Sequence, residues 1–64
     1  MSRATFQVYL DEIEDWRWRL LHDNGNIIAD SGQGYSSKQA AVRGIESVKR
    51  NASEAEIEEV PDPS

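Results

Sequence analysis

The chain has 64 residues, one histidine, no cysteine and a formal net charge of −5. A domain this small buries only about 60% of the surface that its unfolded chain exposes, so a single copy is marginally stable. Neither a disulfide framework nor a structural zinc site is available, because zinc takes about four ligands, typically Cys or His. Oligomerisation is the remaining means of stabilisation, and we expect it here.

The net charge lies entirely at the C-terminal end. Residues 54–64 carry five acidic side chains and no basic one, whereas residues 1–53 carry seven of each sign. A neutral body with an acidic tail argues against general nucleic-acid binding, which depends on clustered Lys and Arg. We expect one folded domain over 1–53 and a disordered, solvated tail over 54–64. Docking of that tail on an unidentified basic protein is the alternative.

No apolar run approaches the length of a membrane span, and the N-terminal residues lack the apolar core of a signal peptide. We therefore expect a cytoplasmic protein with no membrane partner.

Residues 5–10 and 16–22 each alternate apolar and polar side chains, which is typical of strands. If the two strands pair in phase, one sheet face is strongly apolar. The residues expected on that face are Phe6, Val8, Leu10, Trp16, Trp18, Leu20, Ile27 and Ala29. Those expected on the other face are Tyr9, Arg17, Arg19, Leu21 and Ile28.

Asn24-Gly25 separates the second strand from a third apolar run and predicts a two-residue type I′ hairpin. That turn fixes the register of the hairpin. The predicted pairs are Leu21 with Ile28, Leu20 with Ala29, and Arg19 with Asp30. The last pair places opposite charges across the ladder.

A helix is predicted to follow, with Ser36 as its N-cap and Gln39 completing a capping box. Ala41, Ile45, Val48 and Ala52 form its apolar stripe. Gly44 lowers helix propensity and is tolerable where the helix approaches another group closely.

The predicted fold class is therefore α+β: a three-stranded antiparallel sheet followed by one C-terminal helix (βββα). One helix covers one sheet face, and small contact residues such as Ala41 and Ala52 are expected to shield two tryptophans incompletely. We expect a second copy, related by a two-fold axis, to cover the rest. The residues expected at this homodimer interface are Phe6, Tyr9, Trp16, Trp18 and Tyr35.

Several motifs occur in a specific order between Phe6 and Ala52: FQVY, WRWRL, the Asn-Gly turn, SGQGYSSK and GIESVK. This stretch closely resembles the YegP-like family, a small domain of unknown function found in bacteria and haloarchaea. The resemblance implies a unit of three strands and a helix that occurs singly or as tandem copies. A single copy is then expected to pair as a homodimer that mimics the tandem form. The family supplies no reaction, substrate or catalytic residue.

Two groups of residues are candidate ligand sites. Gly32, Gly34, Ser36 and Ser37 precede the helix and could bind an anion, although the order required for a Walker loop is absent. The alternative is a glycine-built reversal and a helix cap. Arg17 and Arg19 could contact a nucleotide or single-stranded nucleic acid, or they could serve cross-strand pairing and cation–π contact with Tyr9.

His22 beside the hairpin turn is expected to be a solvated strand-end residue, and the acidic residues of 11–15 are expected to be solvated rather than to hold a cation. No nucleophile–base–orienter set can be assembled around one histidine. We expect no enzymatic activity, no cofactor and no metal.

Overall fold

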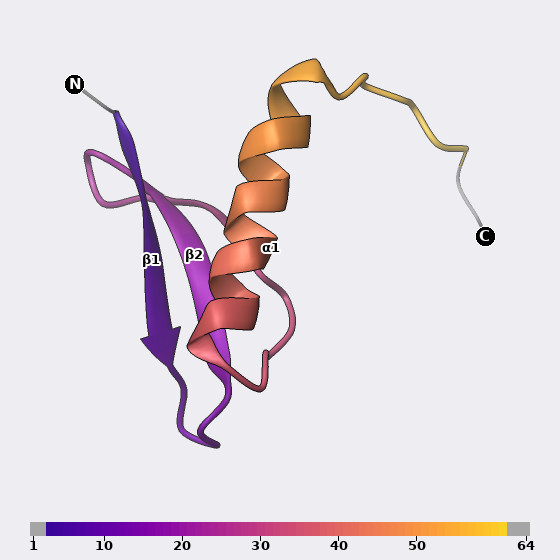
Figure 1. Cartoon of the computed structure of the whole chain (residues 1–64). Coiled ribbons are helices and arrows are strands. Elements are labelled where there is room, and N and C mark those ends of the chain that lie inside the picture. Colours follow the sequence, from indigo (N-terminus) through magenta and orange to yellow (C-terminus); the bar gives the residue numbers. More distant parts are fainter. Residues whose placement is uncertain (1–2, 62–64) are drawn as a thin grey trace.

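The computed structural model describes residues 3–61 (Figure 1). Within them the order of elements is β1 (Ala4–Leu10), β2 (Trp16–His22), β3 (Ile27–Asp30), α1 (Lys38–Asn51) and a turn of 3-10 helix, Ala52–Glu54. The strands form one antiparallel sheet in the order β1-β2-β3. The predicted α+β class, three antiparallel strands followed by one helix, is confirmed. No helix in residues 3–61 is long and apolar enough to cross a membrane.

Strands β1 and β2 pair in the predicted phase. Val8 lies opposite Trp18, and Tyr9 lies opposite Arg17. Because side chains alternate along a strand, this register gathers the apolar residues of both strands on one face. The aromatic and basic residues Tyr9, Arg17 and Arg19 share the other face.

The β2–β3 turn differs from the prediction. The His22 N–H donates to the carbonyl of Asn26 (2.8 Å), and the Gly25 N–H donates to the carbonyl of His22 (2.9 Å). These bonds enclose a loop of residues 23–25, in which Gly25 has a φ of 91° and Asn24 has no positive φ. A type I′ turn needs positive φ at both central residues, so the type I′ prediction is wrong. The connection is one residue longer, with glycine in the left-handed position.

The longer loop also changes the register next to the turn. The two pairs farther from the turn are as predicted: Leu20 with Ala29, and Arg19 with Asp30. Leu21, however, pairs with Ile27 instead of Ile28, and the register shifts between Leu20 and Leu21. Ile28 is the additional residue in β3. Ile27 therefore stands opposite Leu21, away from the apolar face on which it was expected.

The core lies between α1 and the sheet. Trp18, Ala41 and Ile45 are its buried hydrophobic residues in the described chain, at 6%, 0% and 7% exposure. The ring of Phe6 meets the indole of Trp18 edge to face, with centroids 5.5 Å apart. Helix α1 packs against β2 and β1 and makes no comparable contact with β3. The helix was expected to shield the two tryptophans incompletely. That is correct for Trp16, which is only partly buried, and wrong for Trp18, which is buried.

Gly44 shows how close the approach is. A Cβ built on Gly44 would lie 2.6 Å from Oη of Tyr35 and 3.3 Å from Nε1 of Trp18. Tyr35 is fixed at its backbone, since the N–H of Trp16 donates to its carbonyl (2.9 Å) and its own N–H donates to the carbonyl of Trp16 (2.7 Å). The helix thus carries a glycine where two aromatic side chains meet its backbone, as its sequence suggested.

The helix begins one residue later than predicted. Ser37, with φ −145°, is the N-cap, and its hydroxyl accepts a hydrogen bond from the Ala40 N–H (3.1 Å). Ser36 is therefore not the cap. Lys49 and Arg50 lie in the last turn, where the helix dipole favours positive charge.

Beyond Glu54 the described chain is extended and exposed, and it projects away from the sheet (Figure 1). Residues 62–64 of the predicted tail lie outside the described residues. Whether the tail is disordered stays a prediction.

Candidate interaction surface

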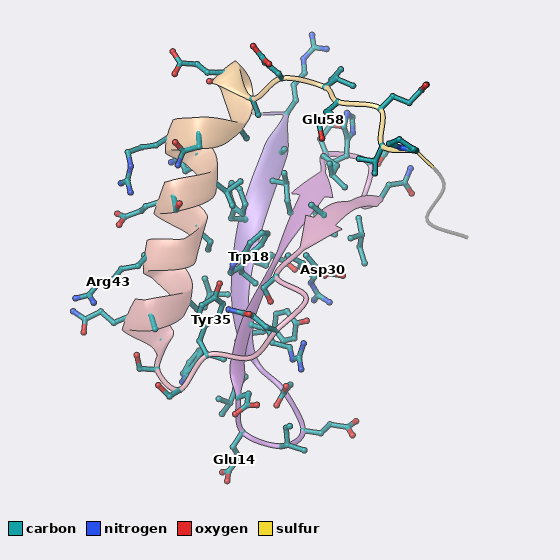
Figure 2. All side chains as sticks on the ribbon, turned by 90° about the vertical axis from the view of Figure 1, so that its right-hand side faces the viewer. Glu14, Trp18, Asp30, Tyr35, Arg43 and Glu58 are labelled. Carbon is teal, nitrogen blue, oxygen red and sulfur yellow. The ribbon has the colours of Figure 1, made fainter. Side chains whose placement is uncertain are left out.

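The face of the sheet turned away from α1 has no element packed over it within residues 3–61. In Figure 2 the helix lies on one side of the sheet and Asp30 lies on the other. The residues of β1 and β2 on this uncovered face include both predicted arginines, Arg17 and Arg19, together with Tyr9. Their side chains are half-buried.

Arg19 is held by two neighbours from β1. Its Nε donates to Oε1 of Gln7 (2.8 Å), and its guanidinium carbon lies 4.7 Å from the centre of the Tyr9 ring. The predicted cation–π contact with Tyr9 is confirmed. Asp30 stands opposite Arg19 in the register, but no ion pair joins these two residues.

Arg17 is paired with Asp11, which follows β1. Its Nε donates to Oδ2 of Asp11 (2.6 Å), and the other carboxylate oxygen accepts from the backbone N–H groups of Ile13 (3.0 Å) and Asp15 (2.9 Å). These bonds favour the ionised carboxylate, and the bond from Arg17 contributes most to lowering the pKa of Asp11. The same bond raises the pKa of Arg17. Asp11 thus organises the β1–β2 connection, in which Glu14 has a positive φ of 64°.

Four of the five predicted interface residues lie beneath α1. Phe6, Trp16 and Tyr35 pack against the core cluster that contains Trp18. Figure 2 shows Trp18 and Tyr35 on the helix side of the sheet. Their aromatic surface is used largely within one copy, and Tyr9 is the member of the predicted set that lies on the uncovered face.

The residues of the predicted anion site serve the local fold. Gly32 has a φ of 70°, and a Cβ on Gly34 would lie 2.6 Å from the Asp15 side chain. Ser37 caps the helix, and Ser36 is exposed beside it. This segment leads into α1, which lies on the opposite side of the sheet from Arg17 and Arg19. The structure therefore does not bring the two groups of predicted ligand residues together.

No grouping typical of a metal site is found in the described chain. Residues 3–61 contain no group of three or more His, Asp or Glu side chains placed to hold a metal ion. His22 is exposed, and its Nδ1 lies 2.6 Å from a carboxylate oxygen of Asp23. A shallow hollow lies elsewhere, on the exposed part of α1, and is lined by Glu46, Lys49 and Arg50.

Exposed aliphatic side chains are absent from the predicted interface set, which contains only aromatic residues. Among residues 3–61, the large hydrophobic residues left exposed are Leu10 (50%), Ile13 (72%), Ile27 (60%), Ile28 (53%), Ile57 (101%) and Val60 (70%). Two of them belong to β3, which the helix does not contact, and two belong to the extended segment after Glu54. The signal in the sequence was the pair of isoleucines in β3 and the isoleucine and valine among the glutamates of the tail.

Comparisons with known proteins agree on the family. Residues 11–59 match the model of the domain of unknown function DUF1508. A UPF0339 protein of Methanosarcina acetivorans is 54% identical over 54 residues, which cover 84% of this chain and 91% of the relative. A UPF0339 protein of Treponema denticola is 44% identical over 55 residues, covering 86% and 93%.

Another relative, the UPF0339 protein in the ptx operon 5′ region of Stutzerimonas stutzeri, is 43% identical over 49 residues, covering 77% of this chain but only 43% of its own length. The fold also matches a solved structure. The NMR solution structure of a protein from Haloferax volcanii superposes with a TM-score of 0.86 at 60% identity, covering 94% of this chain and 100% of that one. The chain belongs to the DUF1508 family, the YegP-like domain of unknown function of archaea and bacteria.

Proposed function

We propose that this chain is a non-catalytic protein-association module that acts as a homodimer. The observation that carries the proposal is the contrast between a core of three buried hydrophobic residues, Trp18, Ala41 and Ile45, and the large aliphatic side chains that residues 3–61 leave exposed. Each such side chain gains about 1.5–3 kcal/mol when it is removed fully from water. A partner surface would cover these exposed side chains, as a second helix would in a larger domain.

The surface to be covered lies on β3 and on the segment after the helix. All four residues of β3 are exposed, and β3 is an edge strand whose backbone groups are available on one side. Ile57 is fully exposed on an extended segment that projects away from its own sheet (Figure 1). A second copy carries the same two surfaces. In a two-fold dimer the same contact therefore forms twice and covers these surfaces on both copies.

The lengths of the relatives support this proposal. The chain spans 91% of the Methanosarcina relative but only 43% of the Stutzerimonas relative. The longer relative has room for a second unit of the same size. A single-unit chain reaches the same two-unit arrangement by pairing with itself.

The experiment is a mass measurement by light scattering during size exclusion, carried out over a dilution series. We expect twice the chain mass at micromolar concentration for the parent protein, and monomer for Ile57→Asp and for Ile27→Asp. Ile13→Asp is the matched control, because Ile13 is an exposed isoleucine in the β1–β2 connection, away from β3. A parent protein that is monomeric and melts in one sharp cooperative transition would refute the proposal.

Weak binding of a nucleotide or single-stranded nucleic acid by Arg17, Arg19 and the helix N-terminus is the alternative function. Both arginines lie on the uncovered face, yet each is already bonded within the chain, to Asp11 and Gln7 respectively. Amide chemical shifts followed during titration with single-stranded oligonucleotides and nucleotides at low salt provide the test. Shifts that cluster on those arginines and on Ser36 would favour this alternative over pure self-association.

An unidentified basic protein that docks on the acidic tail would add a heterologous partner to the homodimer. Deleting residues 54–64 and comparing the proteins retained in a pull-down tests this part. It is abandoned if every partner is retained by the truncated chain.

A further inference from the structure

The β2–β3 turn contains an Asn-Gly pair that plays no part in the proposed association. Asn24 is followed by Gly25, both are exposed, and a Cβ on Gly25 would meet no atom within 4 Å. An asparagine followed by glycine is the pair in which the side-chain amide is most open to attack by the next backbone nitrogen, since glycine has no side chain to obstruct it. We propose that Asn24 is a site of spontaneous deamidation and isoaspartate formation, and that the closed hairpin turn restrains the reaction.

The chemistry requires only water. The Gly25 amide nitrogen, after losing its proton to solvent, attacks Cγ of Asn24. The new N–Cγ bond forms and the Cγ–Nδ2 bond breaks, so ammonia leaves and a five-membered succinimide remains. Water then opens the ring at either carbonyl and yields aspartate or isoaspartate. One water is consumed, one ammonia is released, and no oxidant or reductant takes part.

The folded turn restrains both reacting groups. The Gly25 N–H donates to the carbonyl of His22 (2.9 Å), so the nucleophilic nitrogen is engaged in the hydrogen bond that closes the loop. Oδ1 of Asn24 accepts from the Asn26 N–H (2.9 Å), which fixes the side-chain torsion of the amide that is attacked. Both bonds have to break before Gly25 nitrogen can approach Cγ along a reactive path. The reaction rate should therefore follow the fraction of time for which the turn is open.

The product would change the turn that restrains it. An isoaspartate adds one methylene group to the backbone of a loop that spans only residues 23–25 and sets the register of β3. Either product adds a negative charge beside Asp23, whose side chain is 62% exposed. The modified hairpin is therefore expected to close less readily than the unmodified one.

The test compares the folded protein with the same protein in denaturant, incubated in mildly alkaline buffer. Peptide mass spectrometry with electron-transfer fragmentation follows the conversion of each asparagine. We expect Asn24 to convert roughly tenfold or more slowly in the folded protein, which corresponds to an opening free energy of at least ~1.4 kcal/mol. In denaturant Asn24 should convert faster than Asn26 and Asn51, which precede isoleucine and alanine and act as internal controls.

Two variants complete the design. Asn24→Gln should abolish the reaction at this position, because attack would have to form a six-membered ring. Gly25→Ala should slow it several-fold in denaturant, a comparison that does not depend on whether the variant folds. The proposal is overturned if Asn24 converts equally fast in the folded and denatured protein. It is also overturned if Asn24 converts no faster than Asn26 or Asn51 in denaturant.

Discussion

Replacing Gly44 by alanine tests the close contact between α1 and the aromatic side chains of the core. In an open helix this change stabilises by about 1 kcal/mol, because glycine has the poorer helix propensity. Here the added methyl group would lie 2.6 Å from Oη of Tyr35, 3.2 Å from its Cζ and 3.3 Å from Nε1 of Trp18. Methyl groups forced into a filled site cost about 1–3 kcal/mol. The overpacking outweighs the gain in propensity, and we expect Gly44→Ala to be about 1 kcal/mol less stable.

The backbone of Tyr35 is not free to shift and carry the ring away from a methyl group at position 44. Two hydrogen bonds join that backbone to Trp16, so only the side-chain torsions can respond. Urea unfolding followed by circular dichroism, at one fixed protein concentration, gives the free energy of unfolding. A loss of 1 kcal/mol lowers the melting temperature of a domain this size by roughly 4–8 °C. Arg43→Ala, an exposed helical change one position away, is the matched control and should be nearly neutral.

A double-mutant cycle identifies the contact responsible. Removing the nearest atom with Tyr35→Phe should make the added methyl group at position 44 less costly, so the two changes are non-additive by about 0.5 kcal/mol or more. An increase in stability by the full propensity gain for Gly44→Ala would show that the added methyl group meets no resistance from Tyr35. A cost of Gly44→Ala that Tyr35→Phe leaves unchanged would rule out Tyr35 as the source of that cost.

Three further predictions test local features of the fold. Ser37→Ala should cost about 1 kcal/mol in urea unfolding, whereas Ser36→Ala should cost almost nothing, because Ser37 is the residue whose hydroxyl caps the helix. Gly34→Ala should destabilise the protein and shift amide resonances at the start of β2, since the new methyl group collides with Asp15; an unchanged spectrum would contradict it. The folded-state pKa of Asp11 is lowered, so its contribution to stability is present above the usual carboxyl pKa of about 3.9 and is lost as pH falls through the lower folded value. Asp11→Asn should flatten the acid side of a stability–pH curve, and an identical acid limb in both proteins would contradict this prediction.

The features that the sequence predicted well depend on local periodicity. Alternation in residues 5–10 and 16–22 requires only that neighbouring side chains point to opposite faces, and the pairing of Val8 with Trp18 follows from it. The apolar stripe of the helix through Ala41 and Ile45 is likewise predicted from the spacing of residues that are close together in the sequence. These local patterns also predicted the order of elements, which the fold confirms. The resemblance to the YegP-like family implied the same unit, and the family match confirms the resemblance.

The features that failed depend on choices that periodicity does not determine. Whether Asn24 takes positive φ decides between a loop of two residues and one of three. That choice moved Ile27 from the apolar face on which it was expected to a position opposite Leu21. Burial of Trp18 depended on how near the helix lies. Ala41 was expected to cover the indole poorly, but the helix backbone comes close to the indole at Gly44.

Burial of Trp18 within one copy changes the reason to expect association. The surplus surface is aliphatic and lies on Ile27, Ile28 and Ile57, which are 60%, 53% and 101% exposed. Covering these three side chains in both copies of a two-fold dimer would yield on the order of 10 kcal/mol at the usual value per side chain. Association itself costs about 4–15 kcal/mol in lost freedom of motion. The free energy gained by burial and the free energy lost on association are of similar size, so the dimer depends on each of these contacts. A single charged substitution at Ile57 should therefore be enough to separate the copies.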